Sequence, residues 1–259
     1  MTGQREARAD SFGRVAGRYA AARPGYPGEL FDVLAESAGR RLAGARVADI
    51  GAGTGIASAA LRARGAEVVG VEPAEGMAAE FRRALPDLPL VRGDGNALPF
   101  ADGIFDLVAY AQSWHWTEQR RSLPEAWRVL RPGGALALWW NTSDLGRDWI
   151  AEQHQRMARY CGVEAAPGAR NLGDARAVEV AGLAGYGAVR RLIPWSRRVP
   201  AELHLANLGS HSALLVLGEE RAGAFLAEER RRLAALFPDG VVEEAYVVDL
   251  LVARRPADQ

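Results

Sequence analysis

Lysine is absent from this chain of 259 residues, so all 32 residues counted as Lys and Arg are arginine. Asp and Glu also number 32, which gives a formal net charge of zero. A neutral balance without a basic tract gives no indication of a nucleic-acid surface. We therefore expect no nucleic-acid partner, and we attach no function to the missing lysine.

Cysteine and long apolar runs are also scarce. Cys161 is the single cysteine, which excludes an internal disulfide framework and a cysteine-based zinc site. The histidines lack metal-ligand spacing with acidic residues, so no metal is expected. No uncharged apolar run reaches about eighteen residues, and the residues after Met1 form no apolar signal core. We expect a soluble cytoplasmic protein with no membrane partner, either a monomer or a homodimer.

The segment from Val47 to Ala57 is the most informative part of the chain. Its apolar residues Val47, Ala48 and Ile50 are typical of a strand buried on both faces, and Gly51, Gly53 and Gly55 follow at alternate positions. Glycine tolerates positive φ and lets a flat ligand lie against the main chain. The segment predicts a strand, a ligand-binding turn and a helix from about residue 56. Asp49 could hold the loop amides or face a cationic ligand.

A dinucleotide-binding turn is the nearest alternative, and its spacing does not match. In Gly-x-Gly-x-x-Gly the third glycine would fall on Ile56 or on Ser58. The turn therefore favours a ligand without a pyrophosphate.

A second predicted strand, residues 67 to 72, ends in an acid. Glu72 lies about twenty residues after the first glycine, where this architecture places a carboxylate on a ribose diol. The alternative is a surface acid at a strand end. The spacing favours a nucleoside ligand held by Glu72.

The sequence resembles the class I S-adenosylmethionine-dependent methyltransferases over residues 12 to 140. The motifs that carry the resemblance are Asp49-Ile-Gly-Ala-Gly-Thr-Gly55, Val71-Glu-Pro-Ala-Glu-Gly-Met77, Gly93-Asp-Gly-Asn-Ala-Leu-Pro-Phe100 and Leu130-Arg-Pro-Gly-Gly-Ala-Leu-Ala-Leu138. The resemblance implies S-adenosyl-L-methionine as cofactor. It also implies a Rossmann-like α/β fold, a seven-stranded sheet with helices on both faces and an antiparallel last strand.

The same resemblance implies roles for individual residues. The glycine turn would hold the methionine part of the cofactor, Glu72 the ribose, Asp94 the adenine amino group and Met77 an adenine face. Gly95 replaces the usual alanine and would contribute its amide. The full set of expected cofactor-binding residues is Tyr19, Arg23, Asp49, Gly51, Ala52, Gly53, Gly55, Glu72, Pro73, Met77, Asp94, Gly95 and Gln112.

An amino-terminal arm, residues 1 to 27, precedes the expected core of residues 28 to 140. Within that core the pattern predicts a helix over residues 29 to 42, a fourth strand over 106 to 110, a turn over 131 to 134 and a fifth strand over 135 to 140. Its Phe-x-x-x-Ala-x-x-Tyr-x-x-x-Arg-Pro-x-Tyr-Pro pattern resembles a bacterial small-molecule branch that includes trans-aconitate methyltransferases. By that analogy Tyr19 and Arg23 line the site, with Arg23 gripping the cofactor carboxylate. The alternative is that Arg23 is an exposed residue on an amphipathic helix and has no contact with the cofactor.

The segment Ala111-Gln-Ser-Trp-His-Trp116 follows the fourth predicted strand, at the edge where parallel strands end. His115 is the candidate catalytic residue. The alternative is that its side chain caps the helix that follows. Trp114 and Trp116 are candidate substrate contacts, although Trp116 is also expected to pack in the core.

The chain changes character after residue 140. Residues 141 to 170 and 200 to 217 are candidate substrate caps within a single domain of residues 1 to 259, with Asn141 and Trp149 as further substrate contacts. The implied reaction is methyl transfer to a small organic acceptor through an O-, N- or C-nucleophile, releasing S-adenosylhomocysteine. The alternatives are a nicotinamide-dependent oxidoreductase and a non-catalytic methyltransferase-like binding or regulatory protein.

Overall fold

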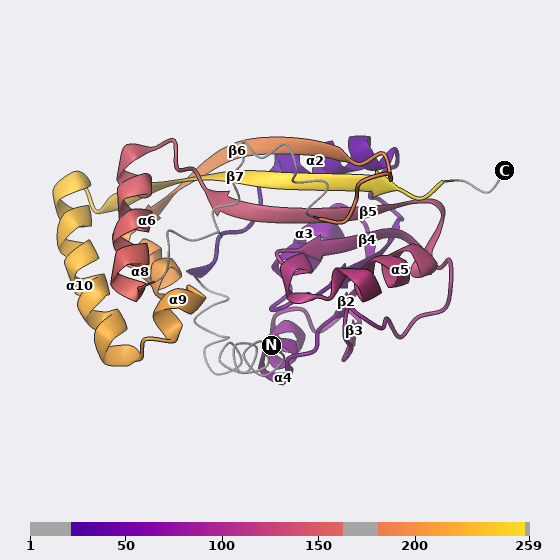
Figure 1. Ribbon diagram of the computed structural model, residues 1–259, viewed down its shortest axis with the longest axis horizontal. Coiled ribbons are helices and arrows are strands. Elements are labelled where there is room, and N and C mark those ends of the chain that lie inside the picture. Colours follow the sequence, from indigo (N-terminus) through magenta and orange to yellow (C-terminus); the bar gives the residue numbers. More distant parts are fainter. Residues whose placement is uncertain (1–21, 163–180, 257–259) are drawn as a thin grey trace. The chain divides into compact units, whose positions relative to one another are not determined.

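The computed structural model describes residues 22–162 and 181–256, in an alternating order of strands and helices (Figure 1). The strands are β1 (Arg46–Ile50), β2 (Glu67–Val71), β3 (Leu90–Val91), β4 (Phe105–Ala111), β5 (Leu130–Ser143), β6 (Val189–Pro200) and β7 (Val241–Arg254). The helices are α2 (Gly28–Ala38), α3 (Ile56–Arg62), α4 (Glu75–Ala84), the 3-10 helix η1 (Trp114–Trp116), α5 (Gln119–Val129), α6 (Asp148–Cys161), α8 (Ala201–Gly209), α9 (Ser212–Leu215) and α10 (Glu219–Leu236).

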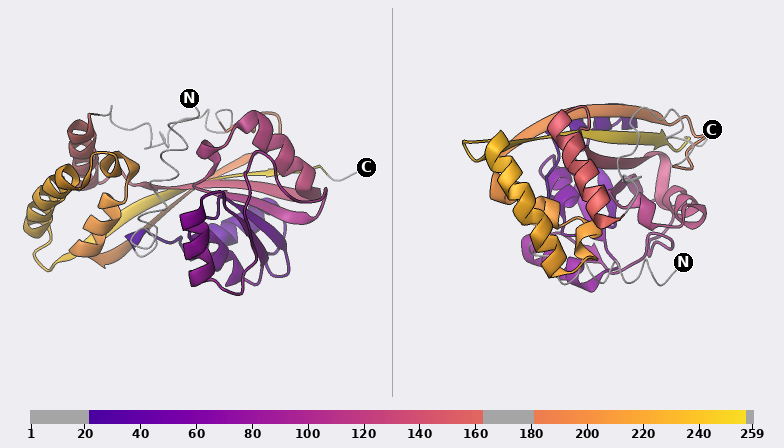
Figure 2. Two further views of the ribbon diagram at one scale, coloured as in Figure 1. Left: turned by 90° about the horizontal axis from the view of Figure 1, so that it is seen from below. Right: turned by 60° about the vertical axis from the view of Figure 1, so that its left-hand side comes forward.

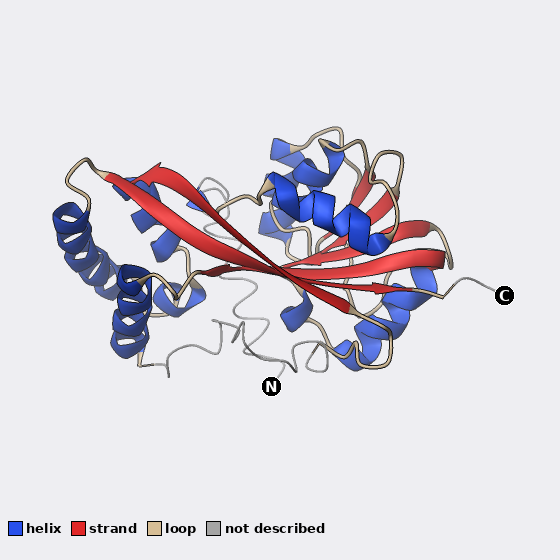
Figure 3. Ribbon diagram, turned by 90° about the horizontal axis from the view of Figure 1, so that it is seen from above, coloured by secondary structure: helices blue, strands red, loops and turns tan. Residues whose placement is uncertain are grey.

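The strands form a seven-stranded sheet in the order β3-β2-β1-β4-β5-β7-β6. Strand β1 pairs in parallel with β2 and with β4, and β4 pairs in parallel with β5. The β5, β7 and β6 neighbours are antiparallel. Helices lie on both faces of the sheet (Figure 3). The predicted Rossmann-like fold with an antiparallel last strand is therefore confirmed.

The described residues divide into two compact units. The glycine-turn unit comprises residues 25–141, 181–193 and 248–256, and the helical unit comprises residues 22–24, 142–162 and 194–247. Both units include residues of β5, β6 and β7. The two candidate cap segments, as far as they are described, fall in the helical unit apart from Asn141.

The glycine-turn unit is built around strands β1 and β4. Nearly every residue of these strands is buried, as parallel strands covered on both faces require. Val108 and Tyr110 of β4 join Leu136 and Leu138 of β5 in one apolar cluster. This packing holds the carboxyl ends of β1 and β4 together, and the predicted site residues follow those ends.

The helical unit contains α6, α8, α9 and α10 (Figure 2). Met157 of α6, Leu208 of α8 and Phe225 of α10 pack in one apolar cluster. A second cluster joins Leu205 and Leu233 to Val242 of β7. Among the described residues, no helix combines the length and apolarity needed to cross a bilayer.

Two predicted boundaries are wrong for local reasons. The helix expected to reach residue 42 ends at Ala38, because Gly39 adopts φ 66° and its amide caps the helix end. Residues 131–134, predicted as a turn, belong to β5. They pair with the chain beyond β7, where the Arg255 N–H donates to Gly134 O at 2.8 Å.

Candidate functional site

The glycine turn after β1 has the positive φ angles that its glycines permit. Gly51, Gly53 and Gly55 have φ angles of 69°, 58° and 92°, in the region that glycine enters at little cost. The N–H groups of Gly51 and Ala52 both donate to Val71 O, at 2.8 and 3.0 Å. The turn is therefore fixed to the end of β2.

The three glycines differ in what surrounds them. A Cβ on Gly51 would lie 2.5 Å from Ser113 Cβ, and one on Gly55 would lie 2.5 Å from Leu85 Cδ1. A Cβ on Gly53 would meet nothing within 4 Å. Gly51 and Gly55 are thus required by packing, whereas the missing side chain of Gly53 leaves open space against the backbone.

Glu72 closes the turn from the end of β2. Its Oε2 accepts the Gly53 N–H at 2.9 Å, and its Oε1 accepts the Ala74 N–H at 2.8 Å. The side chain is buried, and this burial raises the pKa of Glu72 although both amides and Arg92 act in the opposite direction. A carboxylate offers about four acceptor positions, so hydroxyl groups can still bind.

Asp49 lies fully buried at the end of β1. Ser58 of α3 donates to its Oδ2 at 2.6 Å, while Oδ1 is buried without a hydrogen-bond partner among the described residues. Burial raises the pKa of Asp49 to about 6, the Ser58 bond lowers it, and the nearby Glu72 carboxylate adds to the rise. The carboxyl group is positioned for a donor that these residues do not supply.

The motif after β3 lies against the end of β1. Asp94 is exposed, and its Oδ1 accepts the Asn96 N–H at 2.9 Å. A Cβ on Gly95 would lie 3.1 Å from Ile50 Cγ2 and 3.2 Å from Thr117 Cγ2, which leaves little room for the usual alanine. The exposed carboxylate and the packed glycine are neighbours of the β1 end.

Two other expected cofactor residues lie on the segment after β2. Met77 is buried in the first turn of α4. Pro73 is exposed, and its carbonyl accepts a hydrogen bond from Arg92 at 2.6 Å.

The backbone reverses sharply at the end of β4. Gln112 has φ 61° and is the one non-glycine residue with positive φ in the described ranges. Such strain costs of order 1–3 kcal/mol and concentrates at functional sites. The Gln112 Nε2 donates to Asn141 O at 3.4 Å, and Asn141 Nδ2 donates to Gly25 O at 3.5 Å. These bonds bring two predicted site residues together.

The tryptophans flanking His115 are placed differently from the prediction. Trp114 is only 1% exposed, its Nε1 donates to Ala181 O at 3.1 Å, and its ring packs edge-on against Tyr110. Trp116, expected in the core, is 39% exposed. Residues two apart on a 3-10 helix point in different directions, so only one of them can enter the core.

His115 is exposed on the same short helix. The indole N–H of Trp140, near the end of β5, donates to His115 Nδ1 at 3.2 Å. Ser113, two residues earlier, donates through its hydroxyl to Ile50 O. The segment carrying His115 is therefore bonded to the β1 end and to β5.

Arg23 and Trp149 belong to the helical unit. Arg23 NH2 donates to Ser210 O at 3.5 Å. The Trp149 ring packs edge-on against His204 and Phe237, with centroids 5.6 and 5.3 Å away. Tyr19 lies outside the described residues. The expected roles of these residues remain predictions.

Sequence reasoning missed Ser58, Ser113 and Trp140. Trp140 ends the predicted fifth strand, so its position at the shared strand edge was a usable signal. Ser58 and Ser113 carry no comparable signal, because their partners Asp49 and Ile50 are set by how α3 and η1 dock.

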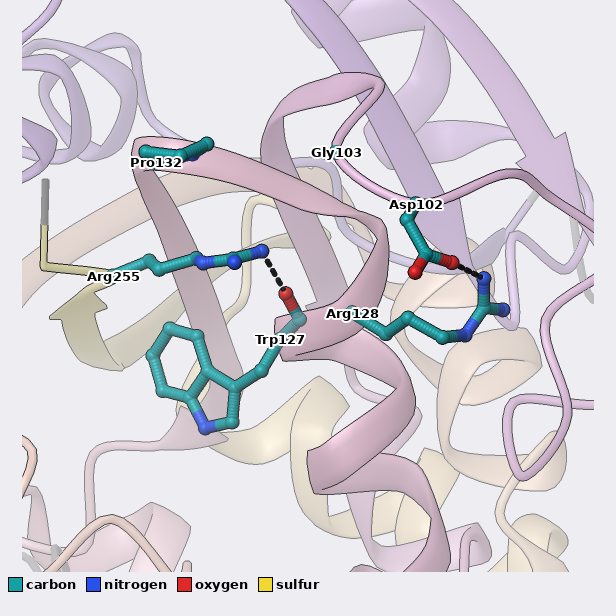
Figure 4. Close-up of a pocket in the computed structure, with 6 residues that line it drawn as sticks. All are labelled: Asp102, Gly103, Trp127, Arg128, Pro132 and Arg255. Carbon is teal, nitrogen blue, oxygen red and sulfur yellow. Dashed lines mark hydrogen bonds and ion pairs between the residues drawn. The ribbon is translucent and has the colours of Figure 1, made fainter. Parts of the chain in front are cut away.

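A surface hollow of about 530 Å³ lies elsewhere on the glycine-turn unit (Figure 4). Its lining residues are Asp102, Gly103, Trp127, Arg128, Pro132 and Arg255. It lies before the amino end of β4, whereas the predicted residues follow the carboxyl ends. Arg128 and Arg255 are engaged there with Asp102 and with the Trp127 carbonyl, both at 2.7 Å, so we assign the hollow no part in the site.

The comparisons with known proteins concern the same region. Residues 48–138 match the family model described as a methyltransferase domain. An uncharacterized methyltransferase of Mycobacterium tuberculosis is 42% identical over 159 residues, 61% of this chain and 63% of that protein. A biotin biosynthesis bifunctional protein of Cellvibrio japonicus is 33% identical over 265 residues, 96% of this chain and 50% of that protein. The chain thus spans less than two thirds of the length of these relatives.

A solved structure supports the fold. A proposed type II methyltransferase from Anaeromyxobacter dehalogenans superposes with a TM-score of 0.69 at 24% identity, covering 91% of this chain and 99% of that one. Residues 48–138, which hold the glycine turn, Glu72 and His115, therefore match a methyltransferase domain and lie within a Rossmann-like methyltransferase fold.

Proposed function

We propose that this chain transfers the methyl group of S-adenosyl-L-methionine to a small organic acceptor and releases S-adenosylhomocysteine. The observation that carries the proposal is the link between Gly53 and Glu72 within the methyltransferase domain. The Gly53 amide is bonded to the Glu72 carboxylate, and open space lies where a Gly53 side chain would be. A backbone surface beside a ribose-type acid suits an adenosyl ligand.

The residues present fit this cofactor. Glu72 would hold the ribose, the glycine turn the methionine part, Asp94 the adenine amino group and Met77 an adenine face. Asp49 has a buried oxygen without a partner among the described residues, which suits a cationic or N–H-bearing ligand. When bound, S-adenosyl-L-methionine supplies an electrophilic methyl group on a sulfonium. Gly51, Ala52, Gly55, Pro73, Gly95 and Gln112 complete the proposed contacts, with Tyr19 and Arg23 from the arm.

The protein's task is then to hold the acceptor in line. Orientation of two reactants accounts for a large part of such a rate enhancement, and a base is required only for an acceptor that must lose a proton. We assign acceptor contacts to His115, Trp116, Asn141 and Trp149. Trp114 is withdrawn from this set because it is buried in the core.

We propose that the acceptor is a small molecule, as in the bacterial small-molecule methyltransferases that the sequence resembles. The names of relatives point to different chemistries, since a demethylmenaquinone methyltransferase of Beutenbergia cavernae is 45% identical over 96 residues, 37% of this chain and 40% of that protein.

Two measurements test the proposal. In calorimetry, S-adenosylhomocysteine should bind and NAD should not, because the third dinucleotide glycine is missing. Incubation with methyl-labelled S-adenosylmethionine and a panel of carboxylates, phenols and amines should transfer label to one class. Tight NAD binding would contradict the cofactor, and cofactor binding without transfer to any acceptor would favour a non-catalytic binding protein.

A further inference from the structure

The hydrogen bond between Trp140 and His115 fixes where the histidine carries its proton. An indole Nε1–H is a donor and has no acceptor lone pair. Because it points at His115 Nδ1 over 3.2 Å, Nδ1 must supply the lone pair. A neutral imidazole with an accepting Nδ1 is protonated on Nε2. Trp140 is itself buried, whereas the bond is partly buried.

This arrangement makes His115 a poor base. In the Nε2–H tautomer, Nε2 has no lone pair to take a proton from an acceptor. The remaining lone pair, on Nδ1, is already used by Trp140. Protonating Nδ1 would set two N–H groups against each other and break the bond, leaving a buried indole donor unsatisfied at about 1–3 kcal/mol.

The segment that carries His115 contacts the glycine turn. Ser113 donates to Ile50 O and packs directly under Gly51, so the chain two residues before His115 touches the glycine turn. His115 itself is exposed on η1. The segment that carries His115 is therefore held against the glycine turn, where the methyl donor is proposed to bind, within one unit of the molecule.

We propose that Trp140 is a positioning residue that holds His115 as an Nε2–H donor, and that His115 orients an anionic oxygen nucleophile of the acceptor. The inference rests on the proposed methyl transfer. A lone pair of the anionic oxygen forms the new bond to the methyl carbon, and the electrons of the carbon–sulfur bond remain on sulfur. The negative charge on oxygen and the positive charge on sulfur both disappear, so no proton needs a base.

The tautomer is tested by NMR of the intact chain labelled with 15N histidine, without cofactor. The chain has four histidines, and His115→Gln identifies the signals of His115. We expect an Nε2–H neutral ring in the wild type and an increased Nδ1–H fraction in Trp140→Phe. Trp139→Phe is the matched control, because the Nε1 of this buried neighbour has no hydrogen-bond partner among the described residues. A wild-type ring protonated on Nδ1, or one unchanged by Trp140→Phe, would overturn the proposal.

The orienting role is tested by kinetics with the acceptor that the labelling assay finds. The hydrogen bond from His115 to the anionic oxygen is strongest in the bound ground state and weakens as that oxygen loses its charge, so His115→Ala should raise KM about tenfold and lower kcat less than about threefold. His115→Gln, which places a donor near the same point, should restore KM. If His115 acted as a base, His115→Ala would instead lower kcat by roughly 10² to 10⁴.

These outcomes separate the two proposals. A fall in kcat of that size with unchanged KM, or no change in either constant, would refute the donor role and leave methyl transfer standing. If no acceptor is methylated, the proposed function fails, and the acceptor-orienting part of the inference fails with it. The NMR result would then decide the Trp140 tautomer by itself.

Discussion

The backbone N–H of Gly53 donates to Oε2 of Glu72 over 2.9 Å. This bond joins the centre of the glycine turn to the residue that follows β2. The same carboxylate holds the Ala74 amide, so one side chain shapes the turn and the start of the next segment. Glu72 is therefore expected to act on the turn geometry as well as on a bound ribose.

Replacing Glu72 with alanine should weaken S-adenosylhomocysteine binding by roughly ten- to a hundredfold. Hydrogen bonds to a buried charged group are worth about 1.5–3 kcal/mol, and the variant loses them while freeing two amides. Isothermal calorimetry measures the affinity. Glu67→Ala, at the exposed first position of the same strand, should bind as the wild type does. Equal affinities for the two variants would contradict the role of Glu72.

Gly53→Ala should impair cofactor binding more than it impairs folding. Its φ of 58° makes any side chain cost about 1–2 kcal/mol, and the new methyl would occupy the space against which the cofactor is proposed to lie. Gly44→Ala is the control, since Gly44 has φ 75° and similarly open surroundings. Both variants should lose similar stability in urea unfolding. Only Gly53→Ala should lose affinity, and a parallel loss in Gly44→Ala would indicate a general effect of strain.

Asp49 should make the protein less stable as pH rises toward neutrality. Its folded pKa of about 6 exceeds the ordinary value of 3.8, so the unfolded chain releases this proton first and the free energy of unfolding falls between about pH 4 and pH 6. The difference corresponds to about 3 kcal/mol. Asp49→Asn should therefore gain stability relative to wild type at pH 7.5, by as much as about 2 kcal/mol, and gain none at pH 4.

Denaturant unfolding at both pH values checks this expectation. Asp87→Asn, whose side chain is 78% exposed, provides the control and should show no such difference. An Asp49→Asn variant that differs from wild type by the same amount at both pH values would show that the buried carboxyl group is not the cause.

A chain of buried polar groups crosses the helical unit. His204 Nδ1 lies 2.8 Å from Glu244 Oε1, and its Nε2 lies 3.0 Å from Gln153 Oε1. The Gln153 amide nitrogen donates to Glu229 at 3.1 Å, so its oxygen must be an acceptor. Both ring nitrogens of His204 therefore lie opposite acceptor oxygens. Arg197 binds the other oxygen of Glu244 at 2.6 Å.

These buried polar groups should make the free energy of unfolding of the helical unit sensitive to acid. Burial alone would raise the pKa of Glu244, but the bonds from His204 and Arg197 lower it to about 2. The resulting stabilisation is present above about pH 5 and is lost as pH falls toward 2, because the unfolded carboxyl group protonates first. Glu244→Gln should be destabilised by about 3 kcal/mol at pH 7 and should converge with wild type in acid.

Urea unfolding between pH 3 and pH 7 measures this convergence. Glu202→Gln is the matched control, because Glu202 pairs with Arg230 in an exposed ion pair that is expected to contribute little. If Glu244→Gln and Glu202→Gln had the same small effect, the buried chain would not stabilise the unit.

The order of elements around the glycine turn could be predicted from local sequence. Strand β1, the three glycines, the helix beginning at Ile56 and the acid after β2 all lie where the pattern places them. The reason is physical, since a short apolar run, a positive φ and a helical period are each decided by neighbouring residues. The fold class was implied by the family resemblance that these motifs carry.

Tertiary structure alone decided which side chains meet. The bond from Trp140 to His115 joins residues 25 positions apart, and that from Gln153 to Glu229 joins residues 76 apart. Trp114 and Trp116 have the same side chain in nearly the same local sequence, yet only Trp114 is buried. Its indole finds Tyr110 and the Ala181 carbonyl when η1 docks. Such contacts depend on the packing of distant segments, which no local pattern specifies.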